Sequence, residues 1–361
     1  MRRLIQVGVG GYGRTWLDTV EAFRGRVEYA ALVDIDPAAL EAARRRVGMA
    51  AVRCATRLEE VLGSVEADSL LCVVPPTWHE SVITQALDAG LHVLSEKPIA
   101  DTMEASRRIV ERARGAEGAF MVSQKGRFHP WVRRFRDAIG SREVGDLSHV
   151  TMHYRAPLFR WGFRHTMDDP LLVEMSIHHF DLLRALLGRE PVSVAGASWN
   201  TPWSGFEGDV AASLRFTFEG GLPVLYEAYA RSSGDLTSWY GDIRAECENG
   251  AVTFVHPSLY LARRGATQQE HVAAPRQDLV RAGGLEEGQT RAFEEFLDAT
   301  EQGREPESAG RTNLVSVAMV FAAIDACRSG SVAQIADYVA WAGGSAASRE
   351  VAPRATHASS S

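Results

Sequence analysis

The stretch Leu4-Ile5-Gln6-Val7-Gly8-Val9-Gly10-Gly11-Tyr12-Gly13 decides the fold of the first part of the chain. Its apolar, β-branched beginning predicts a buried parallel strand over residues 4–9. The glycines then match the pattern G-x-G-x-x-G, which allows a tight turn, a close approach to a pyrophosphate, and packing of a helix on the strand. A helix over residues 12–23 would aim its first amides at the phosphates. The predicted cofactor contacts of this turn are Gly8, Gly10, Gly11, Tyr12 and Gly13.

A second predicted strand ends on an acid at the distance expected for a ribose contact. The run at 29–33 leads into Asp34, which lies 21 residues after Gly13, close to the ~20 of the dinucleotide fingerprint. No adjacent arginine is present to receive a 2′-phosphate, so the sequence favours NAD over NADP. Asp34 could equally be a turn residue at a strand end. Asp36-Pro37 is more simply the N-cap and first residue of the next helix.

Strands and helices continue to alternate up to about residue 123, which predicts a doubly wound parallel sheet. Further strands are expected at 69–74, 92–95 and 119–123, and helices at 78–89 and after capping boxes that begin at Thr56 and Asp101. Ligands bind beyond the carboxyl ends of the strands in such a sheet. Pro75 and Lys97 each follow a predicted strand, so both are expected near the ligand.

Lys97 draws attention because lysine is scarce in this chain. Of the 39 basic residues only Lys97 and Lys125 are lysines. A lysine can lose its proton when its surroundings lower its pKa, whereas an arginine cannot. Lys97 follows Glu96 at the end of the strand predicted at 92–95. A catalytic lysine and a chance lysine on a surface loop both fit this pattern.

From about residue 124 the pattern changes to alternating strands and hairpin signals, which predicts a mostly antiparallel sheet. These strands are expected at 145–155, 192–199, 209–218, 222–231, 241–248 and 251–256, with late helices at 288–301 and 311–329. The predicted fold class is α/β, with an N-terminal Rossmann sheet and a C-terminal α+β domain carrying a large open sheet. The predicted domains are 1–123 for the dinucleotide, 124–342 for substrate and oligomerisation, and a disordered tail at 343–361. A late helix is expected to pack back on the first domain.

One predicted helix at 174–187 carries a polar face. Glu174, His178 and Asp181 have the spacing i, i+4 and i+7, so they are expected on one side of the helix. Flanking carboxylates can hold a histidine in one tautomer and make it more basic, as acid–base catalysis needs. A solvated polar face and, less simply, a metal site are alternatives.

A basic, aromatic segment precedes this helix. Residues 155–165 contain arginines, phenylalanines and a tryptophan. Aromatic faces stack on sugars, and arginines bind hydroxyl or anionic groups. A surface loop held by cation–π pairs is the alternative. The candidate substrate contacts are Arg127, Arg155, Trp161 and Arg164.

The composition indicates the cellular compartment and the classes of binding partner. The 361 residues are 45% hydrophobic and 24% charged, with a net charge of −7. No long basic block indicates nucleic acid, and no apolar run of about 18 residues is expected to span a membrane. The four cysteines lie far apart without metal-ligand spacing, which favours the cytoplasm and argues against a metal site.

With these residues assembled, the sequence resembles the Gfo/Idh/MocA oxidoreductases, the family of glucose–fructose oxidoreductase and inositol dehydrogenase. The resemblance covers roughly residues 4–330 and is most specific in the segment 89–98, with its Ala-Gly-x-His-Val and Glu-Lys-Pro units. It is also carried by the glycine pattern, by Pro75-Pro76-Thr77-Trp78-His79, and by Glu174-x-x-x-His178-x-x-Asp181. The resemblance adds Pro75, His79 and Glu96 to the cofactor contacts.

The resemblance implies an NAD(P)-dependent dehydrogenase or reductase that acts on a hydroxyl of a sugar or cyclitol. The family's active-site lysine falls on Lys97 and its histidine on His178, with Glu174 or Asp181 orienting the histidine. The family's Asp-x-Gly-x-His has Glu174 and Ser176 here, and its Pro-Asn near the nicotinamide is replaced by Pro75-Pro76. The open sheet of the family often forms homodimers or homotetramers.

Other activities remain open at this point. Related enzymes use transient oxidation to process glycosides without net NADH, and the same fold can serve as a nucleotide-sensing regulator. A short-chain dehydrogenase is excluded because it needs Tyr-x-x-x-Lys. The residues four positions before the two lysines are Val93 and Met121.

Overall fold

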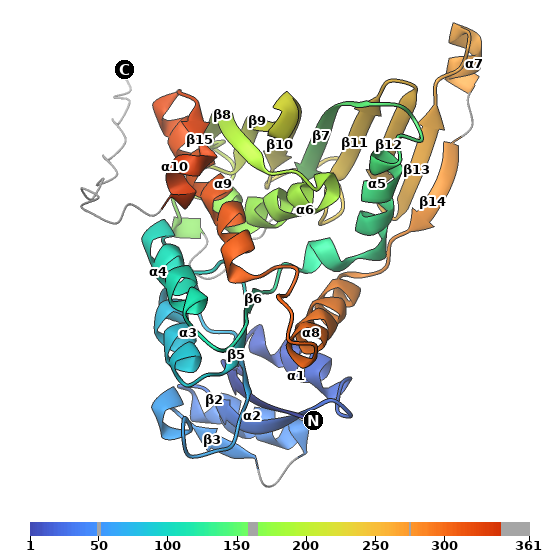
Figure 1. Cartoon of the computed structure of the whole chain (residues 1–361). Coiled ribbons are helices and arrows are strands. Elements are labelled where there is room, and N and C mark those ends of the chain that lie inside the picture. The colour runs from blue at the N-terminus through green and yellow to red at the C-terminus, as the bar shows by residue number, and fades with distance from the viewer. Residues whose placement is uncertain (49–51, 158–164, 274–275, 341–361) are drawn as a thin grey trace, which may run out of the picture.

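The computed structural model describes residues 1–48, 52–157, 165–273 and 276–340. It contains two sheets, one of six strands and one of nine. Figure 1 shows the six-stranded sheet and its helices at the bottom and the nine-stranded sheet at the top, with α8 returning from the C-terminal part to the lower layer. The predicted combination of a Rossmann sheet and a large, mostly antiparallel sheet is confirmed.

The first sheet is parallel throughout, in the order β3-β2-β1-β4-β5-β6. Its strands are β1 (Arg2–Val7), β2 (Val27–Val33), β3 (Arg53–Ala55), β4 (Ser69–Cys72), β5 (His92–Ser95) and β6 (Phe120–Val122). Its helices are α1 (Gly13–Glu21), α2 (Pro37–Val47), η1 (Leu58–Glu60), η2 (Pro76–Trp78), α3 (His79–Asp88) and α4 (Met103–Arg114). The strand order reverses between β1 and β4, and doubly wound sheets bind their ligands at such a point.

Helix starts were predicted with mixed success. Asp36 does cap α2, because its carboxylate accepts a hydrogen bond from the amide of Ala38 at 2.8 Å. Thr102, and not Asp101, caps α4: its backbone is extended and its hydroxyl accepts from the Ala105 amide at 3.1 Å. The predicted capping box at Thr56 is wrong, since η1 begins after Arg57 without a side-chain cap.

The second sheet has the order β14-β13-β12-β11-β7-β10-β9-β8-β15, and only β7 and β10 pair in parallel. Its strands are β7 (Leu147–Arg155), β8 (Pro191–Trp199), β9 (Ala211–Phe218), β10 (Leu222–Tyr229), β11 (Asp242–Cys247), β12 (Gly250–Val255), β13 (Ser258–Arg263), β14 (Arg276–Arg281) and β15 (Ala333–Gln334). Sequence analysis missed β13 to β15. In β14 the residues Arg-Gln-Asp-Leu-Val-Arg are exposed or half-buried, so no alternating apolar pattern marks it.

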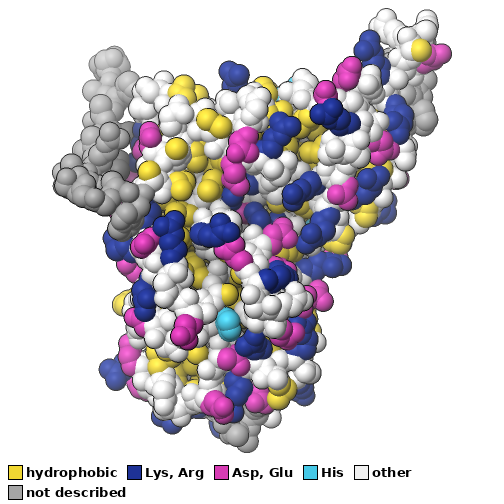
Figure 2. Space-filling model, in the orientation of Figure 1, with side chains coloured by type: hydrophobic (Ala, Val, Ile, Leu, Met, Phe, Trp, Pro, Cys, Tyr) yellow, Lys and Arg dark blue, Asp and Glu magenta, His cyan; other side chains and the backbone are white. Residues whose placement is uncertain are grey.

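Helices cover one face of this sheet. They are α5 (Pro130–Gly140), η5 (Leu171–Ser176), α6 (Ile177–Leu187) and α9 (Gly310–Ser329). η3 (Lys125–Phe128) leads from β6 to α5, and η6 (Glu219–Gly221), α7 (Gln268–Ala273) and α10 (Ile335–Val339) are short. Trp131 of α5 stacks on Phe254 of β12, with ring centroids 3.8 Å apart. On the surface shown in Figure 2, basic and acidic side chains are interspersed over both layers.

α9 corrects the expectation that no segment is apolar enough to span a membrane. By length and composition this helix could do so, with a mean hydropathy of 1.2. However, 67% of the stretch is buried inside the fold, against β8, α4 and α6. Its apolar character is therefore accounted for by packing in the core.

The C-terminal part of the chain returns to the first sheet in two places. α8 (Leu285–Glu301) places Phe293 against Trp16 of α1, with ring centroids 6.1 Å apart. Just before α9, the backbone of Ser308 accepts a hydrogen bond from the amide of Val122 in β6 at 2.9 Å. The two sheets are thus connected by the chain itself at β6 and again by α8.

Candidate functional site

The glycine turn lies at the switch point and is shaped by backbone contacts. Gly8 has a φ of +88°, and a Cβ there would lie 2.3 Å from the carbonyl oxygen of Val73. A Cβ at Gly13 would lie 2.2 Å from the carbonyl oxygen of Gly8. A Cβ at Gly10 would instead meet its nearest atoms at 3.6 Å, an ordinary contact. The fold itself therefore requires Gly8 and Gly13, whereas Gly10 leaves room above the turn for a ligand.

Asp34 faces this turn from the end of β2. Its carboxylate accepts hydrogen bonds from the amides of Val9 at 2.8 Å and Gly10 at 3.0 Å. The half-buried carboxylate thus stands at the edge of the open space over Gly10. Tyr12 is half exposed on the far side of the turn, and Pro75 is exposed after β4. These groups fit a dinucleotide, because the turn is open where the backbone must approach a phosphate and an acid stands where a ribose would lie.

Lys97 reaches from the end of β5 to the second part of the molecule. Its ammonium donates to the backbone carbonyl of Glu174 at 3.1 Å and lies 3.7 Å from the carboxylate of the same residue. Both side chains are largely buried, with 14% of each exposed. The carbonyl belongs to η5, a π-helical turn that leads directly into α6. π-turns recur at functional sites because they redirect side chains within a helix.

His178 follows this turn, in the first turn of α6 and partly exposed. Burial lowers its pKa well below the usual 6.5, and the nearby charges of Lys97, His179 and Lys125 act in the same direction. The ring is therefore neutral at pH 7 and able to accept a proton. Its ring centroid lies 5.8 Å from that of Trp239, a residue that sequence analysis did not single out.

The neighbouring His179 is buried and has a structural role. Its Nδ1 lies 2.8 Å from the hydroxyl of Tyr226, and its Nε2 lies 2.9 Å from the backbone carbonyl of Trp239. Burial lowers its pKa to about 4. A neutral ring can donate from Nε2 to Trp239 and accept at Nδ1 from Tyr226. His179 thus anchors the segment that carries Trp239 beside His178.

Lys125 is the second residue that sequence analysis left without a role. Its ammonium lies 3.2 Å from a carboxylate oxygen of Glu96, and it donates to the hydroxyl of Tyr12 and to the side chain of Gln289. Burial lowers the pKa of Lys125 to about 7 and raises that of Glu96 to about 7. Glu96 also accepts from the indole of Trp16 at 2.9 Å. Lys125 and Glu96 therefore form a buried pair at the base of the glycine turn.

Several predicted site residues have other partners. Both carboxylate oxygens of Asp181 accept from the guanidinium of Arg127 at 2.8 Å, so these two side chains bind each other. That Asp181 orients His178 and that Arg127 binds substrate stay predictions. Arg155 donates to the Asp235 carbonyl at 2.8 Å and supports the segment that carries Trp239.

His79 was predicted to contact the cofactor, but it is fully buried. Its Nδ1 lies 2.9 Å from the carbonyl oxygen of Pro98, and its Nε2 lies 3.0 Å from that of Val74. Burial lowers its pKa. The ring thus joins the turns after β4 and β5 and contacts no open space. Trp161 and Arg164 lie outside the described residues.

No group of three His, Cys, Asp or Glu side chains within the described ranges has an arrangement that could hold a metal ion. The titratable groups of the site are instead two Lys–Glu pairs and one histidine, Lys97–Glu174, Lys125–Glu96 and His178. Glu96, Lys97 and Lys125 follow the parallel strands β5 and β6, whereas Glu174 and His178 belong to η5 and α6.

Two family models match the chain. One, described as an oxidoreductase family with an NAD-binding Rossmann fold, covers residues 2–124, and the other, the GFO/IDH/MocA C-terminal domain, covers residues 132–253. The chain belongs to the Gfo/Idh/MocA family of oxidoreductases. The recognition of this family from the Glu-Lys-Pro segment and the prediction of NAD as the cofactor are confirmed at the level of the family.

Individual relatives agree with this assignment. The uncharacterised protein y4oX of Sinorhizobium fredii is 31% identical over 348 residues, 93% of this chain and 96% of the relative. An inositol 2-dehydrogenase of Corynebacterium glutamicum is 31% identical over 196 residues, 54% of this chain and 57% of the relative. A solved oxidoreductase of Agrobacterium radiobacter, in complex with NAD+, L-tartaric acid and magnesium, is 15% identical with a TM-score of 0.81, covering 93% of this chain and 99% of the other. This last likeness shows the fold.

The contacts in the glycine turn predict different effects of two glycine substitutions. Gly13→Ala should lower both thermal stability and NADH affinity, because the new Cβ would clash with a backbone oxygen at 2.2 Å. Gly10→Ala, the matched control, should keep the wild-type melting temperature and lose NADH affinity alone. Differential scanning fluorimetry and NADH fluorescence titration measure the two quantities. Equal loss of stability in both variants would contradict this division of roles.

Proposed function

We propose that this protein is an NAD-dependent dehydrogenase that oxidises a hydroxyl group of a sugar, cyclitol or related polyol. The observation that carries the proposal is the bond from Lys97 to the Glu174 carbonyl. This bond brings a lysine from the six-stranded parallel sheet to the π-turn that precedes His178. Lys97, which can stabilise an alkoxide, and His178, which can accept the proton of the substrate hydroxyl, then lie beside the cofactor turn.

The residues assigned to the cofactor are those of the open turn. Backbone groups at Gly10, Gly11 and Tyr12 would bind the pyrophosphate, and Asp34 would accept from the ribose hydroxyls. Asp34 would oppose a 2′-phosphate by charge repulsion, which favours NAD over NADP. When bound, the nicotinamide supplies the acceptor for hydride. The chain supplies placement of the reacting groups and transfer of the proton.

His178 is assigned the role of general base. Its lowered pKa keeps the ring neutral, so it can take the hydroxyl proton as the carbinol carbon loses hydride. Lys97 is assigned the hydrogen bond to the same oxygen, where negative charge develops. One such donor is typically worth roughly 3 kcal/mol of transition-state stabilisation. Glu174 lies beside Lys97 and would hold its ammonium in place.

One wall of the site supports the proposed substrate class. Trp239 lies beside His178 with 39% of its surface exposed, and its backbone is held by His179. Aromatic rings of this kind pack on the C–H faces of sugars and cyclitols. The name of the inositol 2-dehydrogenase relative supports the same class. Location in the cytoplasm and assembly through the uncovered face of the large sheet, as a homodimer or homotetramer, stay predictions.

The direct test is a panel of sugars, uronates, inositols and 3-keto sugars, assayed with NAD+ and with NADP+ (or with the reduced forms for the keto sugars). We expect net formation of NADH with at least one polyol and a higher kcat/KM with NAD+ than with NADP+. Product formation without net NADH would favour transient oxidation of a glycoside. Tight binding of NADH with no turnover of any substrate would favour a nucleotide-sensing role.

Lys97→Arg should retain NADH binding and lose at least about 100-fold in kcat. The larger planar head cannot take the place of the ammonium at the Glu174 carbonyl, and small misplacements of a catalytic group are costly. Steady-state kinetics and NADH fluorescence titration measure the two effects. Arg108→Lys serves as the control, because it changes only an exposed ion pair between Arg108 of α4 and Glu80. Near-normal turnover of Lys97→Arg would refute the role of Lys97.

The pH dependence of oxidation should reflect the lowered pKa of His178. A base works in its neutral form, and that form persists down to the lowered pKa. We therefore expect the acid limb of kcat/KM for oxidation to lie below pH 6.5, the ordinary value for histidine. The measurement is a pH–rate profile with saturating NAD+. An acid limb at or above the ordinary value would remove His178 from the role of base.

A further inference from the structure

The proposed reaction requires groups from the two sheets to meet at one carbon atom. Lys97 and the glycine turn belong to the first sheet, whereas His178 belongs to α6 on the second. Lys97 reaches Glu174 through one hydrogen bond to the backbone carbonyl at 3.1 Å, and its ammonium lies 3.7 Å from the carboxylate. A more rigid connection is needed to fix where α6 lies.

Arg127 and Asp181 form such a connection. Arg127 lies in η3, which directly follows β6 of the first sheet and also holds Lys125. Asp181 lies in α6, three residues and so about one turn beyond His178. Nε and Nη2 of Arg127 donate to the two carboxylate oxygens at 2.8 Å each. The side chains are 9% and 1% exposed, so this is a buried, bidentate ion pair.

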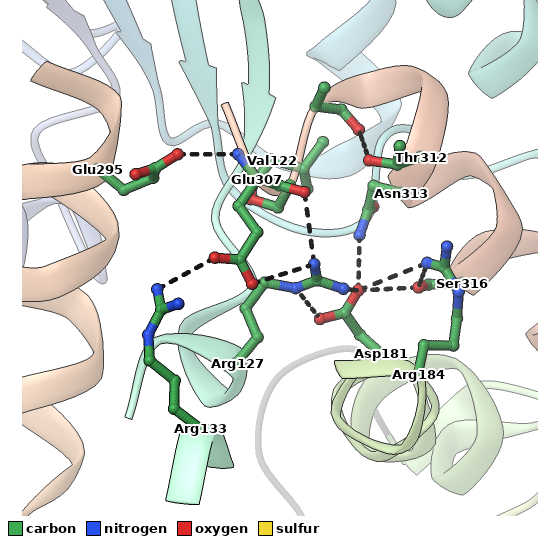
Figure 3. Close-up of polar contacts among 12 residues, drawn as sticks. Val122, Arg127, Arg133, Asp181, Arg184, Glu295, Glu307, Thr312, Asn313 and Ser316 are labelled. Atoms are coloured by element: carbon green, nitrogen blue, oxygen red, sulfur yellow. Dashed lines mark hydrogen bonds and ion pairs between the residues drawn. The ribbon is translucent and has the colours of Figure 1, made fainter. Parts of the chain in front are cut away.

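The pair is braced by α9, as Figure 3 shows. Oδ1 of Asp181 also accepts from Asn313 at 3.2 Å and from Ser316 at 2.9 Å. On the other side, Arg127 lies 3.4 Å from the backbone carbonyl of Glu307 and 3.8 Å from its carboxylate. The next residue, Ser308, is hydrogen bonded to β6. η3, α6, α9 and the edge of the first sheet therefore meet at one ion pair.

Stability alone does not explain this choice of residues. A buried ion pair costs so much in desolvation that apolar residues of similar volume often replace it without loss. What a bidentate ion pair adds is a fixed orientation, because the planar guanidinium and the carboxylate can form both bonds in only one relative arrangement. An orientation fixed one turn from His178 also fixes the direction in which His178 points.

We propose that Arg127 and Asp181 are positioning residues that hold the His178 turn of α6 at a fixed place relative to the Lys97 turn of the first sheet. This inference rests on the proposed function for its effect on turnover. It assigns the pair no contact with substrate or cofactor. Their role is to set the geometry in which His178 and Lys97 reach the same oxygen.

The test compares Asp181→Asn with Glu80→Gln. Glu80 of α3 likewise accepts a bidentate pair of bonds from an arginine, Arg108 of α4, at 2.6 and 2.8 Å. This pair shares no residue with the contacts of Asp181. We expect Asp181→Asn to lose about 10- to 100-fold in kcat, as for a catalytic group displaced by an ångström. Glu80→Gln should keep kcat within about twofold, since it leaves the geometry around α6 intact.

Two readouts separate positioning from a general loss of structure. NADH affinity and substrate KM should stay near the wild-type values in Asp181→Asn, while the primary deuterium isotope effect on kcat should increase because the chemical step becomes slower. The His178 signal in NMR spectra of the cofactor-free protein should shift in Asp181→Asn and not in Glu80→Gln. This last measurement needs no substrate, so it tests the pair even if the proposed dehydrogenase activity is absent.

Equal losses of kcat and melting temperature in Asp181→Asn and Glu80→Gln would overturn the proposal, as would unchanged kcat and unchanged His178 signals in Asp181→Asn. If Asp181→Asn does not fold, Arg127→Lys decides, because it keeps the ion pair and removes the bidentate geometry. It should then lose kcat with little change in NADH affinity. Wild-type kcat in Arg127→Lys would refute the positioning role.

Discussion

Contact between backbones at the switch point is the constraint on which the nucleotide half of the structure depends. The end of β1, the end of β4 and the start of α1 meet where a Cβ at Gly8 or Gly13 would lie 2.3 or 2.2 Å from a carbonyl oxygen. Only a residue without a side chain allows this approach. The close contact sets the direction of α1 and keeps the space over Gly10 open. Asp34 contacts the turn from the end of β2, and Pro75 and Lys97 follow β4 and β5 on the other side of β1.

A second constraint is the pairing of each lysine with a glutamate. Lys97 meets Glu174 across the two sheets, and Lys125 meets Glu96 beneath the glycine turn. A buried ammonium is costly without a partner, and burial still lowers the pKa of Lys125 to about 7 beside Glu96. The charges of both lysines also contribute to the lowered pKa of His178. The surroundings of the base are thus set by residues from both halves of the molecule.

Sequence patterns predicted the parts of the site that depend on local structure. The glycine turn, Asp34 and Lys97 are each defined by a strand and the few residues after it, so their positions followed once the strands were found. The role of Lys125 depends on contacts with Glu96, Tyr12 and Gln289, which are far apart in sequence. The buried partner of Asp181 was missed because Arg127 lies 54 residues away in the sequence. His79 shows the same limit, since only tertiary burial reveals that its ring joins two backbone turns.

His178 and His179 are neighbouring residues of the same type with different roles. The two are adjacent, and burial lowers the pKa of both. Both nitrogens of His179 are within hydrogen-bond distance of Tyr226 and of the Trp239 backbone, so its proton is held in the core. His178 is partly exposed, faces a tryptophan and feels two lysine charges, which leaves a neutral ring able to exchange a proton with a ligand. The helical rotation of about 100° between neighbours places one ring in the core and the other at the site. The π-turn before α6 determines which of the two rings lies in the core. The orientation of α6 therefore determines which histidine can exchange a proton with a ligand.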